Sequence, residues 1–105
     1  MVDVVLVLTT FPDDVEVPAL QELAHELVSA GHAACVSVMG PMASTYRWEG
    51  MVDVARERQV VIKTTADRVP AVEAALTAAH PYDVPELLVV PVTGGGAAYL
   101  AWVRG

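Results

Sequence analysis

The sequence predicts a small α+β domain in which strands and helices follow the order β-α-β-β-α-β, with a short helix at the end. Three observations support this prediction. Runs rich in apolar and β-branched residues recur four times along the 105 residues. Two intervening segments carry apolar residues at helical spacing and have a proline in the first turn. The two middle runs are joined by only a glutamate and a glycine, as in a tight hairpin.

The first strand and the first helix occupy the N-terminal third of the chain. Residues 2–10 are almost continuously apolar, which is typical of a central strand buried on both faces. Residues 11–14 read as a turn in which Asp13 or Asp14 caps the following helix. Pro18 fits only the first turn of that helix, and Gly31 ends it. The helical spacing of its apolar residues predicts one buried face, formed by Leu20, Leu23, Ala24, Leu27 and Val28.

The middle of the chain predicts a long hairpin. A strand begins at residues 33–38, and Gly40-Pro41 interrupts it as a bulge before residues 44–49 continue it. The turn is followed by a strand over residues 52–65. Strands of this length overhang a 105-residue domain. Because exposed strand edges attract other strands, we expect the hairpin to pair with other subunits.

The last third repeats the pattern. Asp67 is suited to cap a second helix, which ends where the stiff, proline-containing connector at residues 80–86 begins. A strand over residues 87–92 and a short helix over residues 97–103 complete the chain. This order is the ferredoxin-like arrangement, an antiparallel sheet with helices on one face. We expect residues 1–105 to form a single domain.

Charge and hydropathy limit the partners. Six Lys and Arg against thirteen Asp and Glu give a net charge of −7, which disfavours nucleic acids and anionic membranes. The apolar runs are too short to cross a bilayer, and no basic segment precedes the first one. The single cysteine, Cys35, suggests a reducing compartment, so we expect the cytoplasm. A mean hydropathy of +0.47 in so short a chain predicts apolar surface buried against other subunits.

Few residues carry obvious chemistry, and each has a structural alternative. His80, with Asp83 and Glu86 close behind, is suited to a divalent transition metal. The alternative is that His80 lies against the end of the second helix while Glu86 pairs with Lys63 or an arginine. Cys35 is either a small buried apolar residue or a soft metal ligand. Four aromatic residues either pack in the core or line a pocket or interface: Tyr46, Trp48, Tyr82 and Trp102.

Several motifs in order resemble one family. They are Thr10-Phe11-Pro12-Asp13, Ala33-Ala34-Cys35-Val36, Tyr46-Arg47-Trp48-Glu49-Gly50, Lys63-Thr64, His80-Pro81-Tyr82-Asp83-Val84-Pro85-Glu86-Leu87 and Tyr99-Leu100-Ala101-Trp102. With them the chain resembles the CutA-type divalent-cation tolerance proteins over nearly its whole length. The resemblance implies a ferredoxin-like fold, a homotrimer with hairpins paired between subunits, and binding of copper and other divalent cations. It implies no established catalytic activity.

The resemblance also implies a cleft between subunits. Its motif positions carry over to Cys35, Trp48, Lys63, His80, Tyr82 and Glu86. Asp83 stands where relatives commonly have glutamate, and Leu8-Thr9 and Ala78-Ala79 replace the cysteines and histidines of some metal-binding relatives. With fewer soft ligands in one subunit, a trimer is expected to assemble the site from copies of His80 or from His80 and a neighbour's carboxylate.

Two functional hypotheses follow, with a third as the simplest reading. The first is a trimeric, cytoplasmic protein without enzymatic activity that binds divalent metal, copper among them. Its expected ligands are His80, Glu86, Asp83 and Cys35, and its expected intersubunit pocket contains Trp48, Lys63 and Tyr82. The alternative is a PII-like signalling trimer that senses small molecules such as nucleotides. The third is a trimer that serves only as a scaffold for a protein partner.

Overall fold

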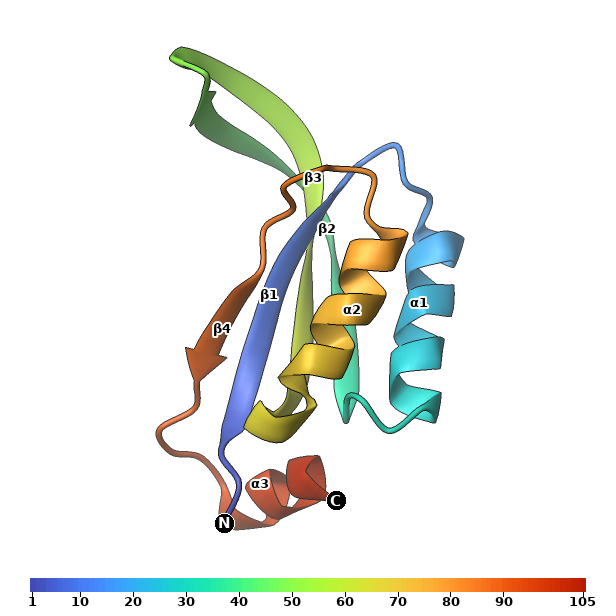
Figure 1. The fold of residues 1–105 in the computed structure, drawn as a ribbon, viewed down its shortest axis with the longest axis vertical. Coiled ribbons are helices and arrows are strands. Elements are labelled where there is room, and N and C mark those ends of the chain that lie inside the picture. The colour runs from blue at the N-terminus through green and yellow to red at the C-terminus, as the bar shows by residue number, and fades with distance from the viewer.

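The computed structural model describes residues 1–105 and has the predicted order of elements (Figure 1). The elements are β1 (Val4–Pro12), α1 (Val17–Ser29), β2 (Cys35–Trp48), β3 (Met51–Thr65), the 3₁₀ turn η1 (Ala66–Arg68), α2 (Val69–Ala79), β4 (Leu88–Pro91) and α3 (Ala97–Arg104). The strands form one sheet in the order β2-β3-β1-β4, and every neighbouring pair is antiparallel. This confirms the predicted α+β, ferredoxin-like fold class.

One face of the sheet carries the core. The helices α1 and α2 lie side by side over this face (Figure 1). The side chains of β1 and β3 alternate across the sheet, so that Val7 and its cross-strand partner Ile62 both point into the core and are fully buried. The buried cluster consists of Val7, Phe11, Leu20, Leu27, Ala33, Val60, Ile62, Val72 and Leu76.

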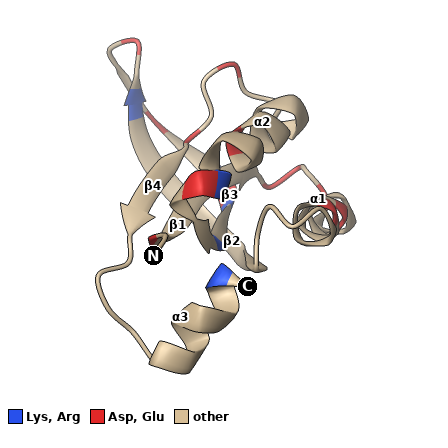
Figure 2. Cartoon of the chain, turned by 60° about the horizontal axis from the view of Figure 1, so that its bottom comes forward, with Lys and Arg blue, Asp and Glu red and all other residues tan.

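The opposite face of the sheet, which we call the open face, has no helix layer of this kind. Its apolar side chains include Leu88 and Val90 on β4, which are 54% and 38% exposed. The helix α3 lies apart from α1 and α2 (Figure 2). It reaches the open face at one end, where Lys63 on β3 contacts Tyr99 on α3. Most of this face is therefore open to another molecule.

The β2–β3 hairpin projects beyond the two core helices (Figure 1). Its strands contain 14 and 15 residues in a molecule whose longest extent is 44 Å. The predicted bulge is confirmed by a register shift between Val38 and Pro41. The predicted turn is also confirmed, because Glu49 and Gly50 have φ values of 50° and 78°. Such angles suit the twist of a tight hairpin, and glycine adopts them without steric cost.

The predicted caps of the first helix are wrong. Neither Asp13 nor Asp14 caps α1; Glu16 stands at the N-cap position and makes no side-chain cap bond. The reason is that the β1–β3 ladder extends further than expected, since the Asp13 N–H donates to the Arg56 carbonyl. The Asp13 carboxylate also lies 3.4 Å from the Arg56 guanidinium, which holds it beside the hairpin.

The predicted cap of the second helix is wrong as well. Asp67 lies inside η1, and Arg68 occupies the N-cap position of α2. The Asp67 carboxylate instead accepts a hydrogen bond from the Thr65 hydroxyl at the end of β3. At the end of α1, Gly31 has a φ of 76°, which confirms its predicted role in ending that helix.

Truncation at the core should be costly, whereas truncation on an exposed helix surface should not. We expect Ile62→Ala to lower the free energy of unfolding by about 2–5 kcal/mol, because it removes a fully buried side chain and leaves a cavity. Val28, which the sequence placed on the buried face of the first helix, is instead 44% exposed on α1, so this part of the prediction is wrong. Val28→Ala should therefore change the free energy of unfolding by less than about 0.5 kcal/mol. Urea unfolding measures both, and equal effects would contradict the described core.

Candidate functional site

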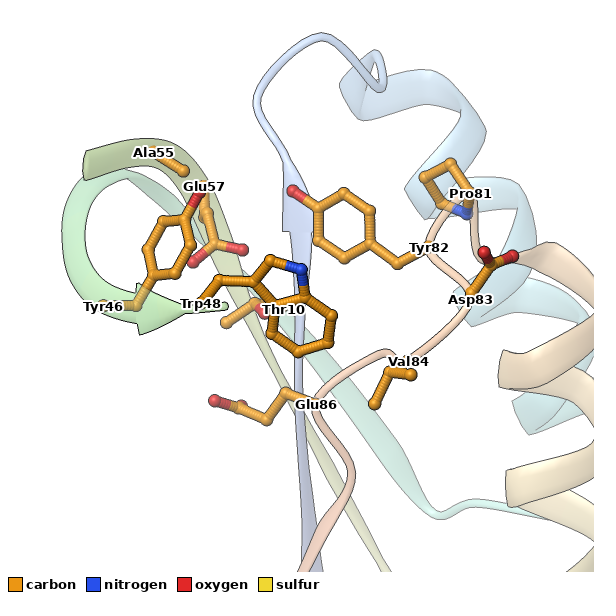
Figure 3. A pocket seen from close by; sticks show the side chains of 10 residues that line it. All are labelled: Thr10, Tyr46, Trp48, Ala55, Glu57, Pro81, Tyr82, Asp83, Val84 and Glu86. Carbon is orange, nitrogen blue, oxygen red and sulfur yellow. The ribbon is translucent and has the colours of Figure 1, made fainter. Parts of the chain in front are cut away.

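A hollow of about 610 Å³ lies between the projecting hairpin and the connector that follows α2 (Figure 3). It is on the open face, at the end of the sheet away from α3. Its lining consists of Thr10, Tyr46, Trp48, Ala55, Glu57, Pro81, Tyr82, Asp83, Val84 and Glu86. The hollow therefore contains four of the residues expected from sequence, Trp48, Tyr82, Asp83 and Glu86.

The aromatic side chains of the hollow come from two elements. Tyr46 and Trp48 are two residues apart on β2 and share its open face, as the strand period requires. Tyr82 faces them from the connector (Figure 3). The three side chains are 42%, 56% and 40% exposed in that order, so they do not form core. Of the two sequence alternatives, the structure favours the pocket or interface.

His80 lies behind the hollow and fixes the connector. Its Nε2 is 2.6 Å from the Thr10 carbonyl oxygen, and its Nδ1 accepts a hydrogen bond of 3.1 Å from the Tyr82 N–H. Because Nδ1 accepts, the ring hydrogen is on Nε2 and is donated to Thr10. The imidazole also stacks on Phe11 with centroids 4.4 Å apart and contacts the Tyr82 ring at 4.9 Å. His80 thus ties the connector to β1 and orients Tyr82.

This geometry bears on both interpretations of His80. The residue stands at the C-cap of α2, as the structural alternative expected, but its ring bonds to β1 rather than to helix carbonyls. Both ring nitrogens are engaged, so a metal ion must displace the Tyr82 N–H from Nδ1 or the Thr10 oxygen from Nε2. A ligand role for His80 stays a prediction that requires this rearrangement.

Glu86 is held by a residue that the sequence did not single out. The side-chain nitrogen of Gln59 donates to the Thr9 carbonyl at 2.7 Å and to Glu86 Oε2 at 3.0 Å. The expected pairing of Glu86 with Lys63 or an arginine is wrong, because Gln59 and Thr10 face each other across β3 and β1 and bring Gln59 to the connector. Only the strand register, which no local pattern encodes, could have identified Gln59.

The hollow is electronegative. Three carboxylates line it, those of Glu57, Asp83 and Glu86, and no lysine, arginine or histidine does. Partial burial raises the pKa of Tyr82 above its ordinary value of 10.0, and the negative charge of Glu57 raises this pKa further. A cation is therefore the favoured occupant of the hollow.

Cys35 and Lys63 lie elsewhere on the open face. They are cross-strand partners on β2 and β3, and Lys63 is six residues along β3 from Glu57, or about 20 Å. Lys63 Nζ donates to the Tyr99 hydroxyl at 3.3 Å, and this bond raises the pKa of Lys63, with a smaller contribution from Cys35. The expected site residues therefore separate: Cys35 and Lys63 lie at one end of the open face, Trp48, Tyr82, Asp83 and Glu86 line the hollow at the other end, and His80 is buried behind it.

Within a single chain the metal-ligating residue types do not converge. No group of three or more His, Cys, Asp and Glu side chains is placed to hold a metal ion. The single chain therefore presents the expected ligands separately and not as a formed metal site. Separately, none of the three helices combines the length and apolarity that a membrane span requires.

Comparison with known proteins gives consistent matches. The model of the family described as "CutA1 divalent ion tolerance protein" matches residues 5–105. A divalent-cation tolerance protein CutA from Pectobacterium atrosepticum is 41% identical over 102 residues, which cover 97% of this chain and 90% of the relative.

Solved structures agree with the sequence matches. A divalent cation tolerance protein from Thermus thermophilus superposes with a TM-score of 0.87 at 35% identity, covering 96% of this chain and 95% of that one. A CutA from Archaeoglobus fulgidus, described as periplasmic, gives a TM-score of 0.84 at 26% identity, covering 95% and 94%.

The role of His80 as a clamp can be measured through stability. We expect His80→Ala to lower the free energy of unfolding by about 2 kcal/mol or more, because it removes two hydrogen bonds and leaves the buried Thr10 carbonyl without its partner. His25→Ala is the matched control, since His25 is exposed on α1 and its ring is hydrogen-bonded to the Ser29 hydroxyl at the surface. Equal losses for the two variants in urea unfolding would contradict the clamp.

Proposed function

Since the chain belongs to the CutA1 divalent ion tolerance protein family, we propose that it is a homotrimer that binds divalent cations, copper among them. The observation that carries the proposal is the electronegative hollow, where three carboxylates have no cationic neighbour in the lining. The family supports the link to divalent cations.

The assembly is supported by apolar surface that one chain leaves exposed. Only 17 of the 105 residues are buried, although 54% of the residues are hydrophobic. Exposed apolar side chains gather on the hairpin and on β4, namely Met39, Tyr46, Trp48, Met51, Val52, Val54, Leu88, Val89 and Val90. The sheet also ends in two unpaired edge strands, β2 and β4, which are suited to pair with neighbouring copies. A closed trimer would cover both features.

The proposed metal ligands are those expected from sequence. The position of each one relative to the hollow determines which ligand atom it supplies. Glu86 and Asp83 supply oxygens at the hollow, and His80 supplies a nitrogen once its bond to Tyr82 or Thr10 opens. Trp48 and Tyr82 form the walls. Because one chain does not bring three ligands together, we propose that neighbouring copies complete the coordination.

Cys35 and Lys63 take separate roles in this proposal. Cys35 is a soft ligand for copper, but it lies beside Lys63 at the other end of the open face. Lys63, bonded to Tyr99, marks the second part of the intersubunit surface rather than the wall of the hollow. We propose no catalytic activity, because the family that the chain belongs to is described by divalent ion tolerance and not by a reaction.

We place the protein in the cytoplasm, on the argument that its lone thiol suits a reducing compartment. The Archaeoglobus fulgidus relative is described as periplasmic, so fractionation of the native cell decides the compartment.

The nucleotide-sensing alternative is disfavoured, because a hollow with three carboxylates and no basic side chain would repel phosphate groups.

Copper titration tests the metal proposal. Trp102→Phe removes the tryptophan outside the hollow, so that Trp48 is the fluorescent reporter. We expect saturable quenching of Trp48 by Cu²⁺, and we expect Glu86→Gln to weaken binding about tenfold or more by removing a charged ligand. Glu73→Gln, an exposed carboxylate on α2, is the control.

Two results would contradict the metal proposal. One is the absence of saturable quenching, and the other is the same curve for Glu86→Gln and Glu73→Gln. In parallel, a thermal-shift comparison of Cu²⁺ with ATP separates the two functional classes, because a ligand of the native state raises the melting temperature. A rise with ATP and none with Cu²⁺ would favour the signalling alternative.

A further inference from the structure

A second hollow lies on the other side of the sheet, between the two core helices. We call it the helix groove. It has a volume of about 190 Å³ and is lined by Leu23, Glu26, Leu27 and Ala30 of α1, by His32 and by Ala75 of α2. The two helices lie side by side and touch each other at few points (Figure 1). Because Ala30 and Ala75 are small, they leave space that larger side chains would fill.

The helix groove opens away from the surfaces that are assigned to assembly. It lies between the helices that cover one side of the sheet, whereas the trimer proposed above covers the open face and the hairpin. The groove therefore uses no surface that the neighbouring copies would take. Each copy of the chain presents one groove to the solvent, in the trimer as in the single chain.

We propose that the helix groove binds a basic segment of another protein, in which one large apolar side chain enters the groove and a neighbouring lysine or arginine pairs with Glu26. The proposal goes beyond divalent-cation binding and does not depend on a bound metal. It rests on the size and the apolar floor of the groove, on the way in which the groove is held, and on the charge around it.

The size and the floor of the groove favour a protein side chain over a free small molecule. Leu23, Leu27 and Ala30 follow one another at helical spacing, and together with Ala75 they give the groove apolar walls. The volume is below the roughly 300–1,000 Å³ of small-molecule sites but suits one leucine or phenylalanine side chain. Protein interfaces gain much of their binding free energy from single anchors of this kind.

The groove is preformed, because the end of α1 fixes one of its walls. Gly31, with a φ of 76°, ends the helix, and the His32 N–H donates to the Leu27 carbonyl at 2.9 Å. The His32 carbonyl in turn accepts a hydrogen bond of 2.6 Å from the Thr64 hydroxyl on β3. His32 is therefore held against the last turn of α1, and a neutral imidazole there offers an acceptor nitrogen to an N–H donor of the partner.

The charge around the groove selects a basic partner. Glu26 lines the groove, and Glu22 lies one turn before it on the same side of α1; both are exposed. Neither α1 nor α2 contains a lysine or an arginine, and Glu26 takes part in no salt bridge of the chain. A second copy of the chain is an unsuitable occupant, because its helices would bring the same negative charge. An anionic membrane is repelled for the same reason.

A matched set of peptides tests the two requirements, an apolar anchor and a positive charge. The probe is a helical peptide with leucine at every third or fourth position and lysine at the others. We expect calorimetric titration of the native protein to give saturable binding of one peptide per chain. Replacing its leucines by alanine, or its lysines by glutamate, should weaken binding by about tenfold or more. No saturable binding of the probe, or equal binding of the alanine peptide, would overturn the proposal.

Amide chemical shifts of the isotope-labelled native protein locate the bound peptide. The changes should gather on the second half of α1, at His32 and around Ala75, and they should spare the hairpin. Changes confined to the hairpin or to the open face would overturn the proposal, because they would place the peptide elsewhere on this acidic protein.

Variants with matched controls test which residues carry the binding. Ala75→Leu fills the groove and should weaken binding of the probe by about tenfold or more, whereas Thr77→Leu should leave it unchanged. Glu26→Gln should weaken it about two- to fivefold, and Glu73→Gln should have no effect. Thr77 and Glu73 are suitable controls, because residues two apart from Ala75 point about 200° away from it on a helix.

Circular dichroism and the native mass establish that each variant is folded and assembled like the parent protein. Full affinity for the probe in both Ala75→Leu and Glu26→Gln would overturn the proposal.

The two proposals fail separately. Ala75→Leu and Glu26→Gln lie outside the hollow, so they should not change the quenching of Trp48 by Cu²⁺, and Glu86→Gln should not change peptide binding. Peptide binding without Cu²⁺ binding supports the helix groove and contradicts the metal site. Cu²⁺ binding without peptide binding has the opposite meaning.

Discussion

The structure depends on a sheet that its own helices cover on one face only. The chain is rich in apolar residues, yet α1 and α2 bury a single cluster between themselves and the sheet. The open face and the projecting hairpin keep apolar side chains in contact with water, and this exposure is unfavourable in proportion to area. The long hairpin, the two edge strands and the hollow all lie outside the part of the sheet that the helices cover. Another copy of the chain is suited to complete each of these surfaces.

His80 connects the core to the hollow. Its ring is buried against Phe11 on one side and contacts Tyr82 on the other, while its two nitrogens join the connector to β1. The motif that suggested a metal ligand therefore has a positioning role in the single chain. Gln59 has a similar role for Glu86. A ligand at the hollow would therefore meet side chains that the packing of β1 and of the connector holds in place.

Local patterns predicted most of the fold. The order of elements, the bulge near Gly40, the Glu49-Gly50 turn and the end of α1 at Gly31 are set by residues close in sequence. The caps were mispredicted because tertiary pairing drew the aspartates elsewhere. For the site, the spacing of Tyr46 and Trp48 predicted a shared face, but the bond between Gln59 and Glu86 and the separation of Lys63 from the hollow depend on strand register. Register joins residues far apart in the chain, so sequence patterns alone did not reveal it.

The native mass of the protein tests the central claim most directly. If assembly covers the open face and the hairpin, sedimentation equilibrium at micromolar concentration gives three times the chain mass of 11.1 kDa. The exposed apolar area makes such an assembly tight, so the mass should not change on tenfold dilution. A folded species of 11.1 kDa across that range would contradict the claim, because the exposed side chains of the hairpin and of β4 would then remain in water.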